Sequence, residues 1–170
     1  SHVSTFLNDF KLTEIGQSLY DLPRAIEWFK RAKAQVEHES TVAEKLDLLT
    51  LVENRKELKG LLDREALLKE IKRQALGDST IRDKWWLISF LEDSEEKREW
   101  LQRIEEQIEE NLARAIGEED ALCEKRELAD CYAFGEKGVK IDLLKAVELY
   151  REIIARDSTF REEVTYINNF

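Results

Sequence analysis

Cysteine and histidine are the first residues to consider for chemistry in this 170-residue chain, and both are scarce. Cys123 and Cys131 are eight residues apart, which on one helix separates them by roughly 12 Å. A disulfide needs Cα atoms within about 7 Å of each other, so we expect two reduced thiols, as in a reducing compartment. His38 is the one histidine outside Ser1-His2, a pair that resembles the remnant of a cleaved tag. A lone histidine near a helix end is usually structural.

Carboxylates and glycines give no stronger sign of chemistry. Glu105-Glu106 and Glu109-Glu110 share a helix surface, but a di-metal carboxylate site also needs a Glu-x-x-His motif, which the sequence lacks. Gly135 and Gly138 follow no strand, so they do not indicate a dinucleotide loop. No Ser, Cys or Lys has a recognisable base and orienting partner. We therefore expect no catalytic, cofactor-binding or metal-binding residue, and no enzyme.

The distribution of charge indicates a class of partner. The formal net charge is -10, and residues 92–127 hold fourteen acidic side chains against six basic ones, a local charge of -8. Nucleic acid is not the expected partner, because phosphate binding needs a basic surface. Two interpretations stay open: a solvated face of long helices, or a docking face for a basic protein. No run of 18 apolar residues occurs, so we expect no membrane span.

Apolar residues recur at spacings of three and four, which predicts an all-helical protein. Thr41 with Glu44, Asp63, and Asp93 with Glu96 are expected to cap helix N-termini. The longest helix is expected to bury one stripe, formed by Leu101, Ile104, Ile108, Leu112 and Ile116, and to end at Gly117. The expected helices cover residues 5–19, 22–36, 41–60, 64–76, a segment after Ser79, 93–117, 119–134 and 143–155, and a short turn follows from Ser158.

The four tryptophans offer candidate binding anchors. Trp85 and Trp86 are adjacent, so on a helix they point about 100° apart and one thin face cannot bury both. One is expected in the core and the other in a groove, although both could pack between helix layers. Trp28 and Trp100 are expected in the core. The candidate partner-binding residues are Trp85, Trp86, Glu105, Glu106, Glu109 and Glu110.

A weak internal repeat runs through the chain. Residues 142–151 (DLLKAVELYR) align with residues 21–30 (DLPRAIEWFK), with Asp, Leu, Ala and Glu identical at matching places. Residues 93–102 form a fainter third copy. This pattern favours pairs of helices that stack as repeated units.

The C-terminal copy resembles a Sel1-like repeat, a relative of the tetratricopeptide repeat. In such a repeat two glycines reverse the chain between helices, a valine packs in the groove, an aspartate caps the second helix and a small alanine permits close approach. Ala129 stands where the family has glycine, and the loop G-E-K-G-V is one residue longer than the family pattern. The residues that carry the resemblance are Leu128, Tyr132, Gly135, Gly138, Val139, Asp142, Lys145, Ala146 and Tyr150, with Asp21, Ala25 and Trp28 at matching places in the N-terminal copy.

The resemblance implies a single helical-repeat domain over residues 3–170. We expect antiparallel helix pairs stacked as a short right-handed α-solenoid: a tetratricopeptide-like pair at 3–38, a divergent helical middle at 40–117 and a Sel1-like pair at 118–157. It further implies a non-catalytic protein–protein interaction module. From the charge, the thiols and the absence of motifs and long apolar runs, we expect a partner of basic character, a place in the cytoplasm, no cofactor and no membrane. Two alternatives remain: a bacterial immunity protein that neutralises a basic toxin domain, and a secreted Sel1-like effector. The sequence leaves the oligomeric state open.

Overall fold

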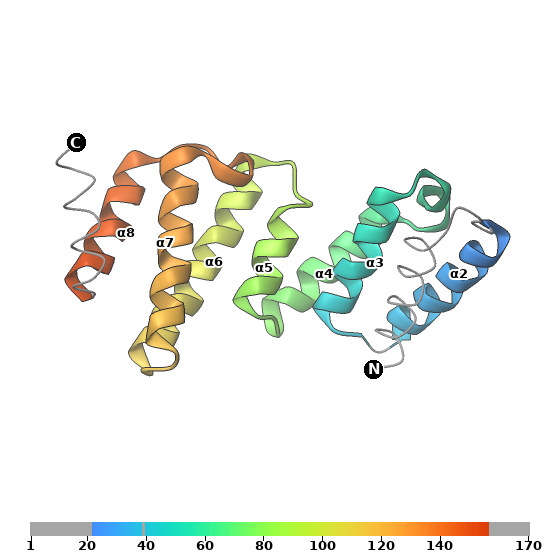
Figure 1. The fold of residues 1–170 in the computed structure, drawn as a ribbon, viewed down its shortest axis with the longest axis horizontal. Coiled ribbons are helices and arrows are strands. Elements are labelled where there is room, and N and C mark those ends of the chain that lie inside the picture. The colour runs from blue at the N-terminus through green and yellow to red at the C-terminus, as the bar shows by residue number, and fades with distance from the viewer. Residues whose placement is uncertain (1–21, 39, 157–170) are drawn as a thin grey trace. The chain divides into compact units, whose positions relative to one another are not determined.

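The computed structural model of the chain describes residues 22–38 and 40–156. Every regular element in this part is a helix, and no strand occurs in it (Figure 1). The predicted all-helical class is therefore confirmed, whereas the right-handed solenoid stays a prediction. The expected helix at 5–19, the turn from Ser158 and the repeat residue Asp21 lie outside the described residues.

The chain divides into two compact units, residues 1–83 and 84–170. The division falls inside helix α5 (Ile81–Ile88), and we describe each unit by itself. The prediction of one continuous helical-repeat domain stays a prediction. None of the helices in the described ranges is both long and apolar enough to cross a bilayer.

The first unit is built around helix α3 (Val42–Asn54). It packs against α2 (Leu22–His38), α4 (Arg64–Gly77) and the short 3₁₀ helix η1 (Lys56–Leu61). A helix covered from several sides must be apolar around most of its circumference, and α3 is. Its buried residues are Val42, Lys45, Leu46, Leu48, Leu49, Leu51 and Val52.

Caps fix where the helices of this unit begin. Thr41 and Glu44 form the expected capping box, in which the Thr41 hydroxyl accepts from the Glu44 N–H at 3.2 Å. Asp63 accepts from the Ala66 N–H and caps α4. The expected helix over 41–60 is wrong in its last six residues, because Arg55 adopts an extended conformation and ends α3 at Asn54. The change of direction places Leu58, on η1, fully in the core.

The second unit contains α6 (Ser94–Ala113), α7 (Glu118–Phe134), the 3₁₀ helix η2 (Glu136–Gly138) and α8 (Leu143–Arg156). Helix α7 packs against both α6 and α8, and Figure 1 shows the three side by side. The predicted stripe of α6 is buried as far as Leu112, but Ile116 is 55 % exposed. Trp100 lies in the core as expected.

The early end of α6 explains the exposure of Ile116. Ala115 adopts a left-handed conformation with φ 53°, and the Ile116 N–H donates to the Asn111 carbonyl at 2.9 Å. This is the Schellman ending, which usually has glycine at the left-handed position. Gly117, the predicted end of the helix, instead lies at the start of α7, also with positive φ.

The joint between α7 and α8 contains the two glycines that the sequence singled out. Gly135 and Gly138 have φ of 67° and 74°, in the region that favours glycine. Val139 is buried behind them. Asp142 accepts a hydrogen bond from the Lys145 N–H at 3.1 Å and so caps α8, and Ala146 is buried one turn later. A helical hairpin results.

Candidate functional site

One face of α6 gathers four of the six candidate partner-binding residues. Glu105, Glu106 and Glu109 line an open hollow of about 450 Å³ together with Gln102. Their spacing of three and four places them on neighbouring positions of one helix surface. Glu110, one residue further, is exposed beside them. We call Gln102, Glu105, Glu106, Glu109 and Glu110 the acidic face.

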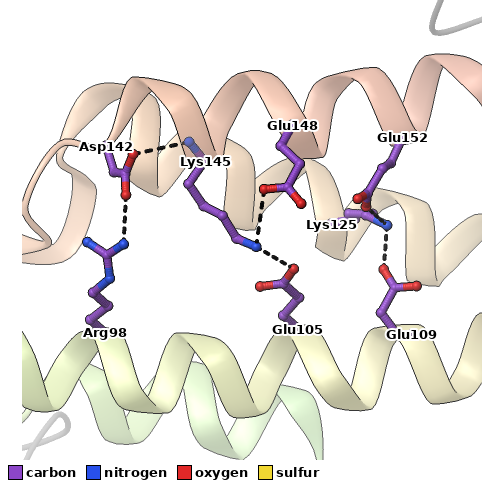
Figure 2. A network of polar contacts seen from close by, with 8 residues as sticks. All are labelled: Arg98, Glu105, Glu109, Lys125, Asp142, Lys145, Glu148 and Glu152. Atoms are coloured by element: carbon purple, nitrogen blue, oxygen red, sulfur yellow. Dashed lines mark hydrogen bonds and ion pairs between the residues drawn. The ribbon is translucent and has the colours of Figure 1, made fainter.

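Two members of the acidic face are bound to lysines of the same chain. Figure 2 shows Glu105 and Glu109 pointing from α6 toward α8. The Lys145 ammonium of α8 lies 2.8 Å from Glu105 and 3.7 Å from Glu148. Burial disfavours the charge of Lys145 and is the largest single influence, but the hydrogen bond to Glu105 and nearby carboxylates outweigh it, so its pKa is raised.

Lys125 of α7 holds the second of these glutamates. Only 2 % of its side chain is exposed, and its ammonium pairs with Glu109 of α6 and with Glu152 of α8, the latter at 2.5 Å. Burial is again the largest influence and lowers the pKa, yet the two hydrogen bonds together raise it above the ordinary lysine value. Lys125 is therefore a charged side chain, buried and compensated on two sides.

Arg98 forms a third link between α6 and α8. Its guanidinium lies 2.7 Å from Asp142 and 5.7 Å from the centre of the Tyr132 ring. The hydrogen bond from the Lys145 backbone N–H, followed by the one from Arg98, lowers the pKa of Asp142. We call the eight residues of Figure 2 the polar seam: Arg98, Glu105, Glu109, Lys125, Asp142, Lys145, Glu148 and Glu152.

The polar seam has a net negative charge, and its carboxylates are more exposed than its most buried cation. Three cations face five carboxylates, which leaves a net charge of -2, and the most buried of its charges is the cation Lys125. Beyond the seam, Glu106 is exposed, and Glu110 is 56 % exposed in an ion pair with Arg114 on the same helix. Such a surface attracts cations and basic side chains.

The two remaining candidate residues lie on α5. Trp85 is 4 % exposed, and the Lys137 ammonium lies 5.5 Å from its ring centre. Its indole N–H is buried and has no hydrogen-bond partner. Trp86 is half-buried. Trp85 is thus a core residue, and Trp86 is the one of the pair whose side chain is partly exposed to solvent.

Other residues that the sequence analysis considered lie apart from the acidic face. Cys123 is exposed and Cys131 is buried, and both are free thiols. Burial raises the pKa of Cys131 to about 12. Within residues 22–38 and 40–156 no group of three His, Cys, Asp or Glu side chains is arranged to hold a metal. The expectation that Trp28 lies in the core is wrong, because Trp28 is only half-buried. It lines a second open hollow of about 510 Å³ on α2, with Pro23, Arg24, Glu27 and Arg31.

The lysine partners of the acidic face were not foreseen from the sequence. Lys145 matches the repeat pattern, which does not relate it to Glu105, and no motif relates Lys125 to Glu109 or Glu152. Pairs formed between helices depend on which faces meet in space. Local spacing does not contain that information.

Comparison with protein-family models, curated proteins and solved structures gave no match for this chain. What the structure establishes is an all-helical protein with an acidic face on α6. The resemblance to Sel1-like and tetratricopeptide repeats stays a prediction.

Proposed function

We propose that this chain is a non-catalytic protein–protein interaction module that binds a basic protein through the acidic face of α6. The observation that carries the proposal is the arrangement of charge around the hollow. Three glutamates and Gln102 form its lining, whereas the side chain of Lys125, which pairs with Glu109, is only 2 % exposed. A basic partner would meet carboxylates first.

The polar seam supports this role by fixing two of the carboxylates in advance. Glu105 and Glu109 are held by Lys145 and Lys125, so binding need not immobilise them again. Glu106 and Glu110 stand free of the seam, at positions where arginine or lysine side chains of a partner could reach them. Preorganised and exposed carboxylates together favour fast, charge-steered association.

Aromatic contact is the second component of the proposed surface. Because Trp85 is in the core, Trp86 on α5 is the remaining aromatic candidate. Half-buried tryptophans are frequent anchors at interfaces, since they combine a large apolar area with few rotatable bonds. Binding that persists at high salt would be attributed to such contact.

The proposal is tested by capture of partners from a lysate of the source organism at low and at high salt. The bait is compared with Glu106→Gln/Glu110→Gln and with the control Glu57→Gln/Glu65→Gln. The control also removes two exposed charges, one from a surface ion pair with Arg55 and one from a pair with Arg64. We expect one dominant basic protein that is lost at high salt and with the α6 variant alone.

The identity of the captured protein distinguishes between the possible roles of this chain. A nuclease or another toxin domain would make the chain an immunity protein. Capture that is equal for both variants and insensitive to salt would contradict the acidic face as the binding surface.

A further inference from the structure

Helix α2 has a positively charged surface that the proposed function does not use. Arg24, Trp28 and Arg31 recur at spacings of four and three, so they share one side of the helix, where they line the second hollow together with Glu27. The buried residues Phe29, Ala32 and Val36 lie on another side. Helix α2 contains four lysines and arginines against two glutamates, in a chain whose formal net charge is -10. A surface of this kind fits carboxylates of a partner.

The charges on this side of α2 alternate in sign. Arg24, Glu27 and Arg31 are all exposed, and they read positive, negative and positive along the helix. The first gap is three residues and the second is four, so the two arginines are roughly 10 Å apart. A matching surface must present negative, positive and negative charges over the same distance.

The outer side of α6 carries that opposite order. Glu99, Arg103 and Glu106 are all exposed and recur at gaps of four and three residues. The buried stripe of α6, which includes Leu101 and Ile104, lies on the other side of the helix. The three charges therefore face away from the core, and Glu99 and Glu106 are again roughly 10 Å apart.

The two patterns coincide when the helices are laid antiparallel. Read in opposite directions, the gaps on both helices are three residues followed by four. Every facing position then joins opposite charges, in the pairs Arg24 with Glu106, Glu27 with Arg103, and Arg31 with Glu99. In the same register Trp28 faces Gln102, the uncharged member of the acidic face. The half-buried indole thus meets a side chain without a charge to desolvate.

We propose that α2 of one copy of this chain docks antiparallel along the outer side of α6 of a second copy. A second copy is the occupant that the pattern identifies, because the same chain carries both halves of the match. The contact consists of exposed charge pairs, so it is weak and sensitive to salt. It rests on the proposed function in one respect, since Glu106 belongs to the acidic face. Self-association and binding of a basic protein therefore compete for this residue.

Charge reversal on either helix tests the contact without any foreign partner. Sedimentation equilibrium of the wild type at low salt, from about 10 µM to about 1 mM, should show an average mass that rises with concentration. High salt should return it to the monomer. Arg24→Glu/Arg31→Glu alone should remain monomeric, and so should Glu99→Arg/Glu106→Arg alone. An equimolar mixture of the two should associate again, because each supplies the helix that the other lacks.

A matched control separates the contact from net charge. Lys56→Glu/Lys59→Glu makes the same change in net charge as the α2 variant, at two exposed positions of η1, and should associate like the wild type. Circular dichroism checks that each variant is folded, and recovery in the mixture shows it independently.

Three results would overturn the proposal. They are a wild type that stays monomeric throughout the range, a single-helix variant that still associates, and a mixture of folded variants that does not recover. None of them bears on the capture of a basic protein by the acidic face, so the two proposals can fail separately.

Discussion

The ammonium of Lys97 donates a hydrogen bond to the carbonyl oxygen of Lys137 at 2.7 Å, which ties α6 to the joint between α7 and α8. Forty residues separate the two along the chain. Lys97 is buried, so the carbonyl satisfies an ammonium that has little access to water. The glycine that follows Lys137 leaves the space in which this contact is made.

Gly138→Ala should destabilise the chain by about 2 kcal/mol, because φ of 74° is strained for alanine and the new methyl would displace Lys97. A Cβ at this position would lie 2.6 Å from the Lys97 ammonium. Urea denaturation followed by circular dichroism measures the effect.

Gly117→Ala is the matched control, since it has positive φ but meets no atom closer than 4.0 Å. It should cost about 1 kcal/mol. In a Lys97→Met background the cost of Gly138→Ala should fall toward that of the control. An unchanged cost would show that Lys97 has no part in the requirement for glycine.

Ala115→Gly should stabilise the protein by roughly 0.5–1 kcal/mol, because glycine adopts the left-handed conformation without the strain of a Cβ. Ala115 is exposed and has φ of 53°, so the methyl group contributes little packing. The denaturation midpoint should rise. Ala113→Gly, at the last helical residue of α6, serves as the control and should lower it. A fall in both variants would contradict the Schellman ending.

Asp142→Ala should destabilise more than Asp142→Asn, because asparagine retains the cap on α8 and loses only the charge that pairs with Arg98. The lowered pKa of Asp142 gives the pH dependence. The ionised Asp142 contributes fully to the free energy of unfolding at pH values above the pKa of an aspartate in the unfolded chain, about 3.9. This contribution is lost as the pH falls below that value toward the lowered pKa of the folded protein. The difference in the free energy of unfolding between wild type and Asp142→Asn should therefore become smaller as the pH falls below about 4. A difference that is constant down to pH 2 would exclude the charge pair as its source.

Cys123 should react rapidly with Ellman's reagent at pH 8, whereas Cys131 should react only when the protein unfolds. Burial holds the pKa of Cys131 at about 12, so the thiolate is not formed at that pH, and the side chain is inaccessible. Cys123→Ser should abolish the fast phase. Two fast thiols in the wild type would contradict the buried placement of Cys131.

The same raised pKa makes Cys131 a source of alkaline instability. The unfolded thiol ionises near pH 8.5, so its stabilising contribution is complete below that pH and is lost as pH rises toward 12. Relative to Cys131→Ala, the wild type should lose up to about 1.4 kcal/mol more per pH unit in this range. Parallel pH profiles of the two proteins would contradict the assignment.

The sequence alone predicts the helix caps and the glycine turn, because these features depend on residues that are close together in the chain. The caps at Thr41, Asp63 and Asp93 each bind the backbone N–H groups expected of them, because a cap involves only the next three residues. The positive φ of Gly135 and Gly138 follows from the need to reverse the chain between two helices.

It could not predict what depends on packing between helices. Arg55 is extended and Ala115 is left-handed, although arginine and alanine both have high helix propensity. At these two positions the packing of the core outweighs the local preference for helix. The binding of Glu105 and Glu109 to lysines of α8 and α7 depends on which faces meet. Exposed glutamates and paired glutamates have the same local sequence pattern.

The central claim is that exposed carboxylates on α6 bind a basic protein. Its most direct test is the dissociation constant of the captured partner for Glu106→Lys/Glu110→Lys, compared with the control Glu57→Lys/Glu65→Lys at low salt. We predict a weakening of roughly tenfold or more for the α6 variant and little change for the control, because only the first places cations against the partner. Equal dissociation constants for the two variants would contradict the account.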